Sequence, residues 1–92
     1  MSHGSQFVAK RLRELRSQAG LSQEQSAALV GVTFKYYQRL ESGAVPGIRL
    51  STLEKVANAY SIDLASFFSR RCPKIRKPKA LPPPHRFRKP RR

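Results

Sequence analysis

The stretch Gln23–Leu40, which reads QEQSAALVGVTFKYYQRL, decides the fold. Within it the small residue Ala27 precedes Gly31 by four positions, and apolar anchors follow at Tyr37 and Leu40. Two helices that cross steeply over a short turn need a small side chain at the crossing and a residue at the turn that tolerates φ > 0. Tyr37 and Leu40, three residues apart, share one face of a helix. The stretch therefore predicts two short helices joined by a tight turn.

The second of these helices has an outer face opposite its anchors, formed by Phe34, Lys35, Gln38 and Arg39. In a helix-turn-helix the second helix lies in the major groove of DNA. There Lys and Arg donate hydrogen bonds to guanine, and an apolar ring packs on a thymine methyl group. We expect this face to read DNA, with a solvated helix face as the alternative. For Phe34 a second alternative, covering a neighbouring protein surface, stays open.

Capping signals divide the first 69 residues into five predicted helices. They run from about 5 to 19, from Ser22 to Gly31, from Thr33 to Gly43, from near 49–51 with Ser51 and Glu54 as a capping box, and from Asp63 onward. No part of this region alternates over the length of a strand, and helices this short must share one core. The predicted fold class is all-α, a compact five-helix domain.

The composition changes abruptly at Arg70. Residues 70–92 hold 11 of the 19 Lys and Arg, six of the seven prolines and no acidic residue. Their large apolar residues, Ile75, Leu81 and Phe87, are too few to form a core. We therefore predict a domain over residues 1–69, followed by a disordered basic proline-rich tail over residues 70–92.

The net charge of +14 indicates a polyanionic partner, of which nucleic acid is the most natural. For the tail, sequence-independent phosphate contact explains the composition most directly, and Arg70, Arg71 and Lys74 are its first candidates. RNA binding and a protein partner held through Pro82–Pro84 are the alternatives. No apolar run approaches ~18 residues, and the tail has no amphipathic period, so we expect no membrane contact.

The sequence offers nothing on which to base catalysis or metal binding. It has no nucleophile with a base and no Gly-rich phosphate loop, and His3 and His85 are isolated. Cys72 is the single cysteine, which excludes an internal disulfide and a cysteine-rich zinc site. Its basic neighbours favour the thiolate, although we interpret it as an incidental thiol. We expect no enzyme activity, no cofactor and no metal. The N-terminus does not resemble a signal peptide, so a cytoplasmic protein is expected.

Roughly residues 7–68 resemble the lambda-repressor-like DNA-binding domains, the repressor/Cro-type helix-turn-helix (XRE) family. The resemblance rests on four motifs in order: the L-R-x-x-x-G-L-S-Q entry, the Ala27–Gly31 pair, the R-L-E-S-G exit and the V-A-x-A-Y-x-I helix. It implies a five-helix lambda-repressor-like fold that binds double-stranded DNA as a homodimer. It also implies a bacterial or phage-encoded protein associated with the nucleoid.

The resemblance also implies roles for single residues. Gln23 matches a glutamine that holds a DNA phosphate beside a helix N-terminus, and Arg16 and Glu41 match a structural salt bridge. Ser26 departs from the family, because it replaces the usual buried leucine and weakens the core. Thr33, Phe34, Lys35 and Arg39 match positions that face the major groove, with Phe34 in place of a polar reader. From the residues themselves we add Gln38 to this face, and the Ser22 and Tyr36 hydroxyl groups as phosphate contacts.

The leading functional hypothesis is a sequence-specific DNA-binding transcriptional regulator, a repressor that occupies its operator as a dimer. One alternative is an antitoxin or other interaction protein, whose DNA-binding domain regulates its own operon while the tail binds a partner. A second alternative is RNA binding led by the tail, which has Phe87 as its one aromatic residue.

Overall fold

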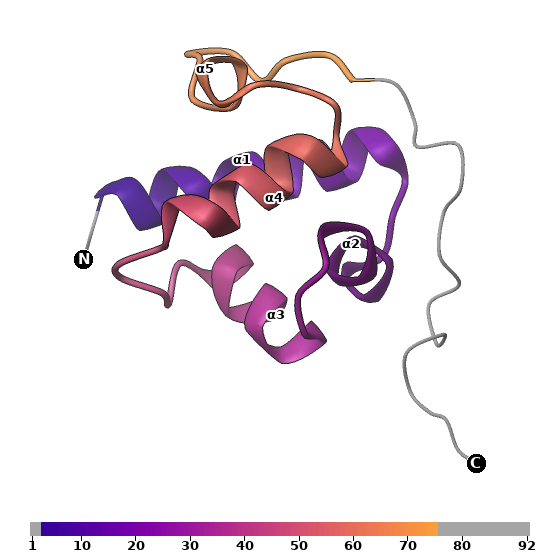
Figure 1. The fold of residues 1–92 in the computed structure, drawn as a ribbon, viewed down its shortest axis with the longest axis vertical. Coiled ribbons are helices and arrows are strands. Elements are labelled where there is room, and N and C mark those ends of the chain that lie inside the picture. The colour runs from indigo at the N-terminus through magenta and orange to yellow at the C-terminus, as the bar shows by residue number, and fades with distance from the viewer. Residues whose placement is uncertain (1–2, 76–92) are drawn as a thin grey trace.

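The computed structural model describes residues 3–75, which form five helices and no strand (Figure 1). The helices are α1 His3–Ala19, α2 Gln23–Val30, α3 Phe34–Ser42, α4 Leu50–Ala59 and α5 Leu64–Phe67. Helices α1 and α4 make a middle layer, with α2 and α3 on one side and α5 on the other (Figure 1). The all-α, five-helix architecture predicted from the sequence is confirmed.

Helix capping follows the sequence signals at three of the four predicted N-caps. The amide of Gln25 donates to the Ser22 hydroxyl (3.1 Å) and the amide of Ser22 donates to the Gln25 side chain (3.0 Å), which completes the capping box of α2. The Thr33 hydroxyl caps α3 by accepting from the Tyr36 amide, and the Asp63 carboxylate caps α5 by accepting from the Ser66 amide. The turn between α2 and α3 is made by Gly31 at φ 92°, in the left-handed region that favours glycine.

Helix α4 starts within the predicted range, but its capping differs from the prediction. The expected Ser51–Glu54 capping box is wrong, because the helix begins at Leu50 with Arg49 as its N-cap. Arg49 makes no side-chain capping bond, and its carbonyl accepts hydrogen bonds from the amides of Thr52 (3.0 Å) and Leu53 (3.2 Å) instead. Thr52, in the first turn of the helix, is buried in the domain.

The core contains the two anchors of α3, since Tyr37 and Leu40 are both buried. Ser26, where the family pattern has a leucine, is also completely buried, and its hydroxyl lies 3.0 Å from the hydroxyl of Tyr60. This hydrogen bond satisfies two buried polar groups and offsets part of the cost of placing a serine there. The buried Tyr37 hydroxyl makes no hydrogen bond with described residues, and burial raises its pKa.

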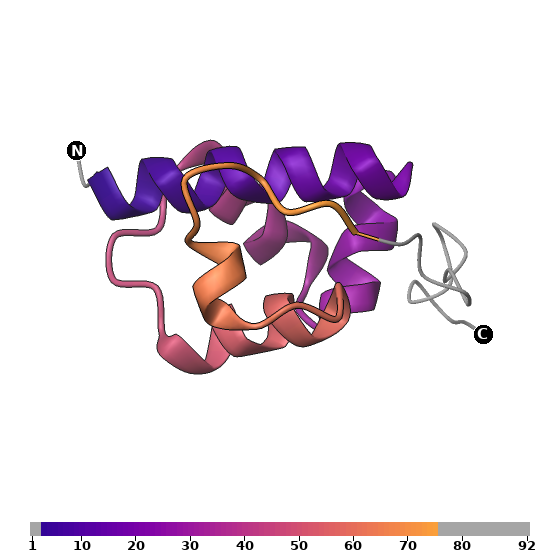
Figure 2. The same cartoon turned by 90° about the horizontal axis from the view of Figure 1, so that it is seen from above.

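The chain beyond α5 stays against the domain as far as Ile75. Residues 69–75 run along α1 (Figure 2), where side chains of α1 bond their backbone. Arg11, itself buried, donates to the carbonyls of Phe67 (2.5 Å), Ser69 (2.9 Å) and Arg70 (3.5 Å). Gln18 donates to the Pro73 carbonyl (2.8 Å) and accepts from the Ile75 amide (3.1 Å).

The sequence did not indicate this contact, because polar side chains of another helix hold the segment and it has few apolar residues of its own. The described residues end at Ile75. The predicted disorder of residues 76–92 lies outside the described residues.

The carboxylate of Glu41, near the end of α3, joins three helices. It accepts hydrogen bonds from Arg16 of α1 (2.7 Å from Nε and 3.1 Å from Nη2) and from the Gln23 amide of α2 (3.1 Å). Arg13 of α1 donates to the backbone carbonyl of Glu41 (2.6 Å), which neutralises part of the negative end of α3. We call these four residues the Glu41 network.

The charge of Glu41 is stabilised inside the domain. Burial on its own would raise the pKa of this carboxyl group, but the hydrogen bonds from Arg16 and Gln23 outweigh burial and hold the pKa below its usual value. A carboxyl group whose pKa is lower in the folded state stabilises the fold above its unfolded pKa. That contribution is lost as the pH falls through the lowered, folded value.

Arg16→Ala and Glu41→Ala should each destabilise the domain by about 2–4 kcal/mol, because each leaves an uncompensated charge. The double variant should lose less than the sum of the two, since the two groups interact directly. Urea melts of the wild type, the two single variants and the double variant at pH 7 measure this coupling. Additive losses of stability would show that the two side chains have no interaction energy with each other. At a pH below the folded pKa of Glu41, the coupling should shrink.

Arg11→Met should cost about 2–3 kcal/mol, because it removes the charged donor that satisfies three backbone carbonyls. Lys10→Met is the matched control: it removes a neighbouring charge from an exposed position and should change stability by no more than about 0.5 kcal/mol. Urea melts of both variants check the comparison. Equal stability of the two would mean that water replaces Arg11 at these carbonyls.

Candidate nucleic-acid interface

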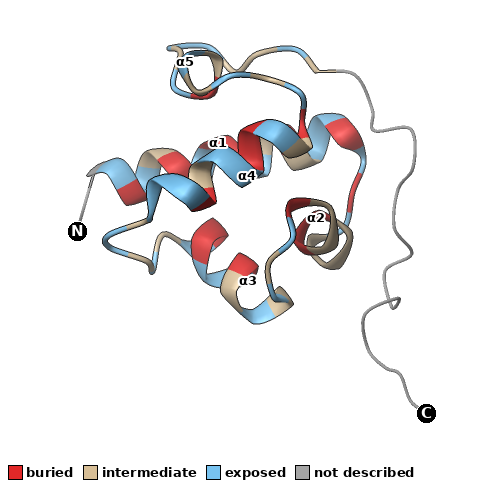
Figure 3. Cartoon of the chain, viewed as in Figure 1, coloured by how far each residue is buried: buried red, intermediate tan, exposed pale blue. Residues whose placement is uncertain are grey.

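Helix α3 is buried on one side and exposed on the other (Figure 3). Of the residues expected to face DNA bases, four are exposed and Phe34 is half-buried; the exposed four are Thr33, Lys35, Gln38 and Arg39. The opposite face holds the buried Tyr37 and Leu40. The structure therefore presents these five side chains together on the outer side of one fixed helix.

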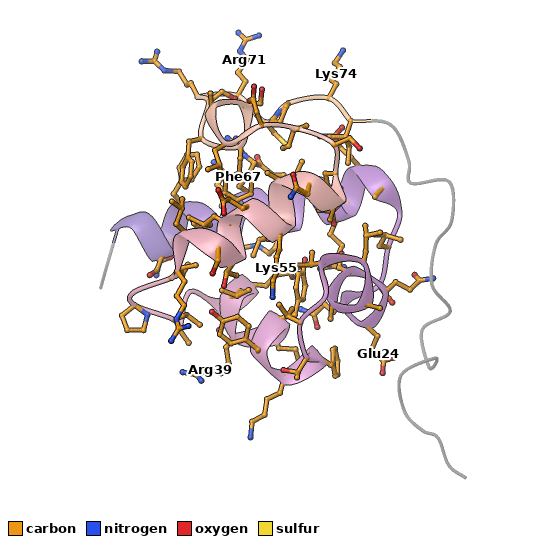
Figure 4. All side chains as sticks on the ribbon, viewed as in Figure 1. Glu24, Arg39, Lys55, Phe67, Arg71 and Lys74 are labelled. Atoms are coloured by element: carbon orange, nitrogen blue, oxygen red, sulfur yellow. The ribbon has the colours of Figure 1, made fainter. Side chains whose placement is uncertain are left out.

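The two cations on this face are available to an external partner. Within residues 3–75 the ion pairs are Arg11–Glu14 and Arg16–Glu41, so neither Lys35 nor Arg39 is neutralised by an acidic group. Figure 4 shows Arg39 on the α3 side of the molecule, away from α1 and α4. Unpaired cations on an exposed helix suit the hydrogen-bond acceptors of guanine or a phosphate.

The predicted phosphate contacts at the start of α2 have partners inside the protein. The Ser22 hydroxyl caps its own helix, and the half-buried Gln23 side chain donates one N–H to Glu41. A carboxamide nitrogen carries two N–H groups, so Gln23 keeps one for an anion at the α2 N-terminus. Tyr36, on α3, is half-buried.

Arg70, Arg71 and Lys74 are not part of this interface. All three are exposed, but they lie on the segment after α5, across the middle layer from α3. Figure 4 shows Arg71 and Lys74 pointing away from the side on which Arg39 lies. A single straight duplex that lies against α3 therefore does not also reach Arg70, Arg71 and Lys74.

Sequence reasoning missed the role of Arg13 in positioning α3, and it named Gln23 only as a phosphate contact. Arg13 holds the C-terminal end of the helix through the Glu41 carbonyl, and Gln23 joins α2 to the same glutamate. A signal for Arg13 was present, because it lies three residues before Arg16 and hence on the same face of α1. Nothing in the sequence indicated that the Gln23 amide would turn toward Glu41.

The environment of Cys72 also differs from the expectation. Burial raises the pKa of its thiol, although the Gln18 amide donates a hydrogen bond to Sγ (3.2 Å) that works in the opposite direction. The neighbouring arginines and lysine therefore do not produce a thiolate. Within residues 3–75 no three potential metal ligands lie together, and no helix is long and apolar enough to cross a membrane.

Comparisons with known proteins agree with this geometry. A family model described as a helix-turn-helix domain matches residues 8–66. The chain is 44% identical over 70 residues to the HTH-type transcriptional regulator PuuR of Escherichia coli (strain K12) and, equally, to that of Shigella flexneri. Each match covers 75% of this chain and 37% of the relative, so the chain spans well under half of the length of these proteins.

No solved structure matches the chain. The family model nevertheless covers more than half of the residues, and its limits enclose α2, the turn at Gly31 and α3. The chain belongs to the helix-turn-helix domain family.

Proposed function

We propose that this protein is a sequence-specific DNA-binding regulator of transcription that reads the major groove with α3. The observation that carries the proposal is the exposed outer face of α3, which presents Lys35 and Arg39 without acidic partners while the Glu41 network fixes the helix behind them. A fixed helix with free cations and amides matches the requirements of base readout. The similarity to proteins named as transcriptional regulators supports the same function.

Within this proposal the residues divide into two groups. Arg39 and Lys35 donate hydrogen bonds to guanine. Thr33 and Gln38 make further hydrogen bonds to base edges, and Phe34 packs on a thymine methyl group. The phosphate contacts that fix the register come from residues beside this face, namely Ser22, Gln23 and Tyr36. The positive end of α2 favours a phosphate at that place.

We further propose that the protein acts as a repressor and binds its operator as a homodimer. One recognition helix contacts only ~3–5 base pairs, which is too few to specify a site in a genome. Two copies related by a two-fold axis would place their helices in half-sites about 10–10.5 base pairs apart. A regulator that occupies such a site without further chemistry blocks transcription by competing for the promoter.

Arg39→Ala should abolish discrimination at one base pair and cost about 1–3 kcal/mol on the specific duplex, with little change on random DNA. The specific duplex is obtained first, by selecting bound sequences from a random library with the wild-type protein. Affinities are then measured for that duplex and for each of its single base-pair substitutions at one salt concentration.

The matched control is Arg71→Ala, which removes the same charge on the opposite side of the molecule and should leave discrimination intact. Equal losses of affinity on the specific and random duplexes would show that Arg39 contacts a phosphate and not a base. A library from which no sequence is enriched would contradict sequence-specific binding altogether.

Residues 76–92 contribute eight cations that we propose to contact phosphates flanking the site. If about 3–5 of them do so, ending the chain after Ile75 should reduce the slope of log K against log[salt] by about 3–4.5. Sequence preference should survive, because base edges are read by α3. Ending the chain at this point keeps the Gln18 contacts to Pro73 and Ile75. An unchanged slope, measured on one specific and one random duplex, would show that this segment does not touch DNA.

A further inference from the structure

Three exposed cations lie on the segment that faces away from α3. Arg70, Arg71 and Lys74 belong to the segment after α5, and the α1–α4 layer separates them from the recognition helix (Figures 1 and 4). We call these three residues the rear cations. The DNA contact proposed for α3 does not use them.

The backbone that carries the rear cations is held in place. Arg11 bonds the carbonyls of Ser69 and Arg70, and Gln18 bonds the Pro73 carbonyl and the Ile75 amide. These backbone groups are turned toward α1, and the rear cations remain exposed. The backbone that carries the cations is therefore held by hydrogen bonds, and less entropy is lost when they bind a ligand.

No acidic group neutralises the rear cations within the described part of the chain, where neither ion pair includes any of them. Glu14 of α1 is already paired with Arg11 at 3.0 Å. Asp63 accepts a hydrogen bond from the Ser66 amide at the start of α5. Three like charges without counter-charges raise the local potential and favour an anionic ligand.

We propose that the rear cations bind the phosphates of a second DNA duplex, so that one protein molecule bridges two duplexes. This inference rests on the proposed function, in which α3 holds the first duplex. Duplex DNA carries one charge per ~1.7 Å along its axis, so three adjacent cations contact three phosphates without base recognition.

The composition of the segment favours duplex DNA over other polyanions. A protein interface is centred on apolar or aromatic side chains. The apolar residues of the segment 70–75 are Cys72, Pro73 and Ile75, and all three are half-buried. Single-stranded nucleic acid is held by stacking on aromatic rings, and this segment has no aromatic residue. Phosphate contact needs only cations in a fixed array.

The test is a bridging assay with the full chain. The duplex selected by the wild-type protein is attached to beads, and a labelled random-sequence duplex is offered in solution at low salt. The wild-type protein should bring the labelled duplex to the beads. The triple variant Arg70→Ala, Arg71→Ala, Lys74→Ala should load on the bead duplex as the wild type does, yet recover at least about five times less of the labelled duplex.

A control variant removes three exposed charges that belong to neither proposed DNA surface, by Lys10→Ala, Arg49→Ala and Lys55→Ala. It should recover more than half of the wild-type amount, and thermal melts should show that both variants fold. Equal losses from the two variants would mean that only total charge matters, which overturns the proposed surface. Unchanged recovery with the rear variant would also overturn it, and would indicate bridging by a dimer through two α3 helices.

Failure of the wild-type protein to load on the bead duplex would refute the proposed function and not the rear surface. Binding of the wild type and the rear variant to a single random duplex then decides the question. Three phosphate contacts predict a slope of log K against log[salt] shallower by about 2–3 for the rear variant. Equal slopes would overturn the inference.

Discussion

The position of α3 depends on one buried carboxylate. Helix α3 has nine residues, too few to be stable alone in water. Its two apolar anchors, Tyr37 and Leu40, fix one face in the core but leave the direction of its axis to other contacts. Glu41 supplies these contacts by joining α3 to Arg16 of α1 and to Gln23 of α2. The side chains that we propose to read DNA owe their common orientation to this network.

Helix α1 makes polar contacts on both sides of the molecule, with different residues on each side. Arg13 and Arg16 contact the end of α3, while Arg11 and Gln18 hold the segment that follows α5. The structure thus separates two sets of cations that the sequence presents only as a high net charge. In our account the set on α3 recognises bases, and the set behind it contacts phosphates.

Much of the fold follows from local signals in the sequence. Ser22, Thr33 and Asp63 start their helices as predicted, because in each case a side-chain oxygen accepts a hydrogen bond from a free amide three residues later. The signal at Ser51 failed, because α4 begins at Leu50 with Arg49 as its N-cap. The path of residues 70–75 could not be predicted, because it depends on hydrogen bonds from distant Arg11 and Gln18 that leave no periodic pattern.

The candidate interface, too, could be predicted from the sequence only in part. Helical spacing was enough to identify the outer face of α3, on which Lys35 and Arg39 lie. Only the three-dimensional arrangement placed Arg70, Arg71 and Lys74 on the opposite side, since a sequence carries no information on which side of a domain a terminal segment lies. The same limit concealed the turn of the Gln23 amide toward Glu41.

Amide hydrogen exchange tests the central claim most directly, by comparing the wild type with Glu41→Gln at pH 7. The substitution keeps the shape of the side chain and removes its charge. If the network holds α3, the α3 amides should exchange about tenfold faster, relative to the α4 amides that report global unfolding. Acceleration by the same factor in every helix, or none in α3, would contradict the account.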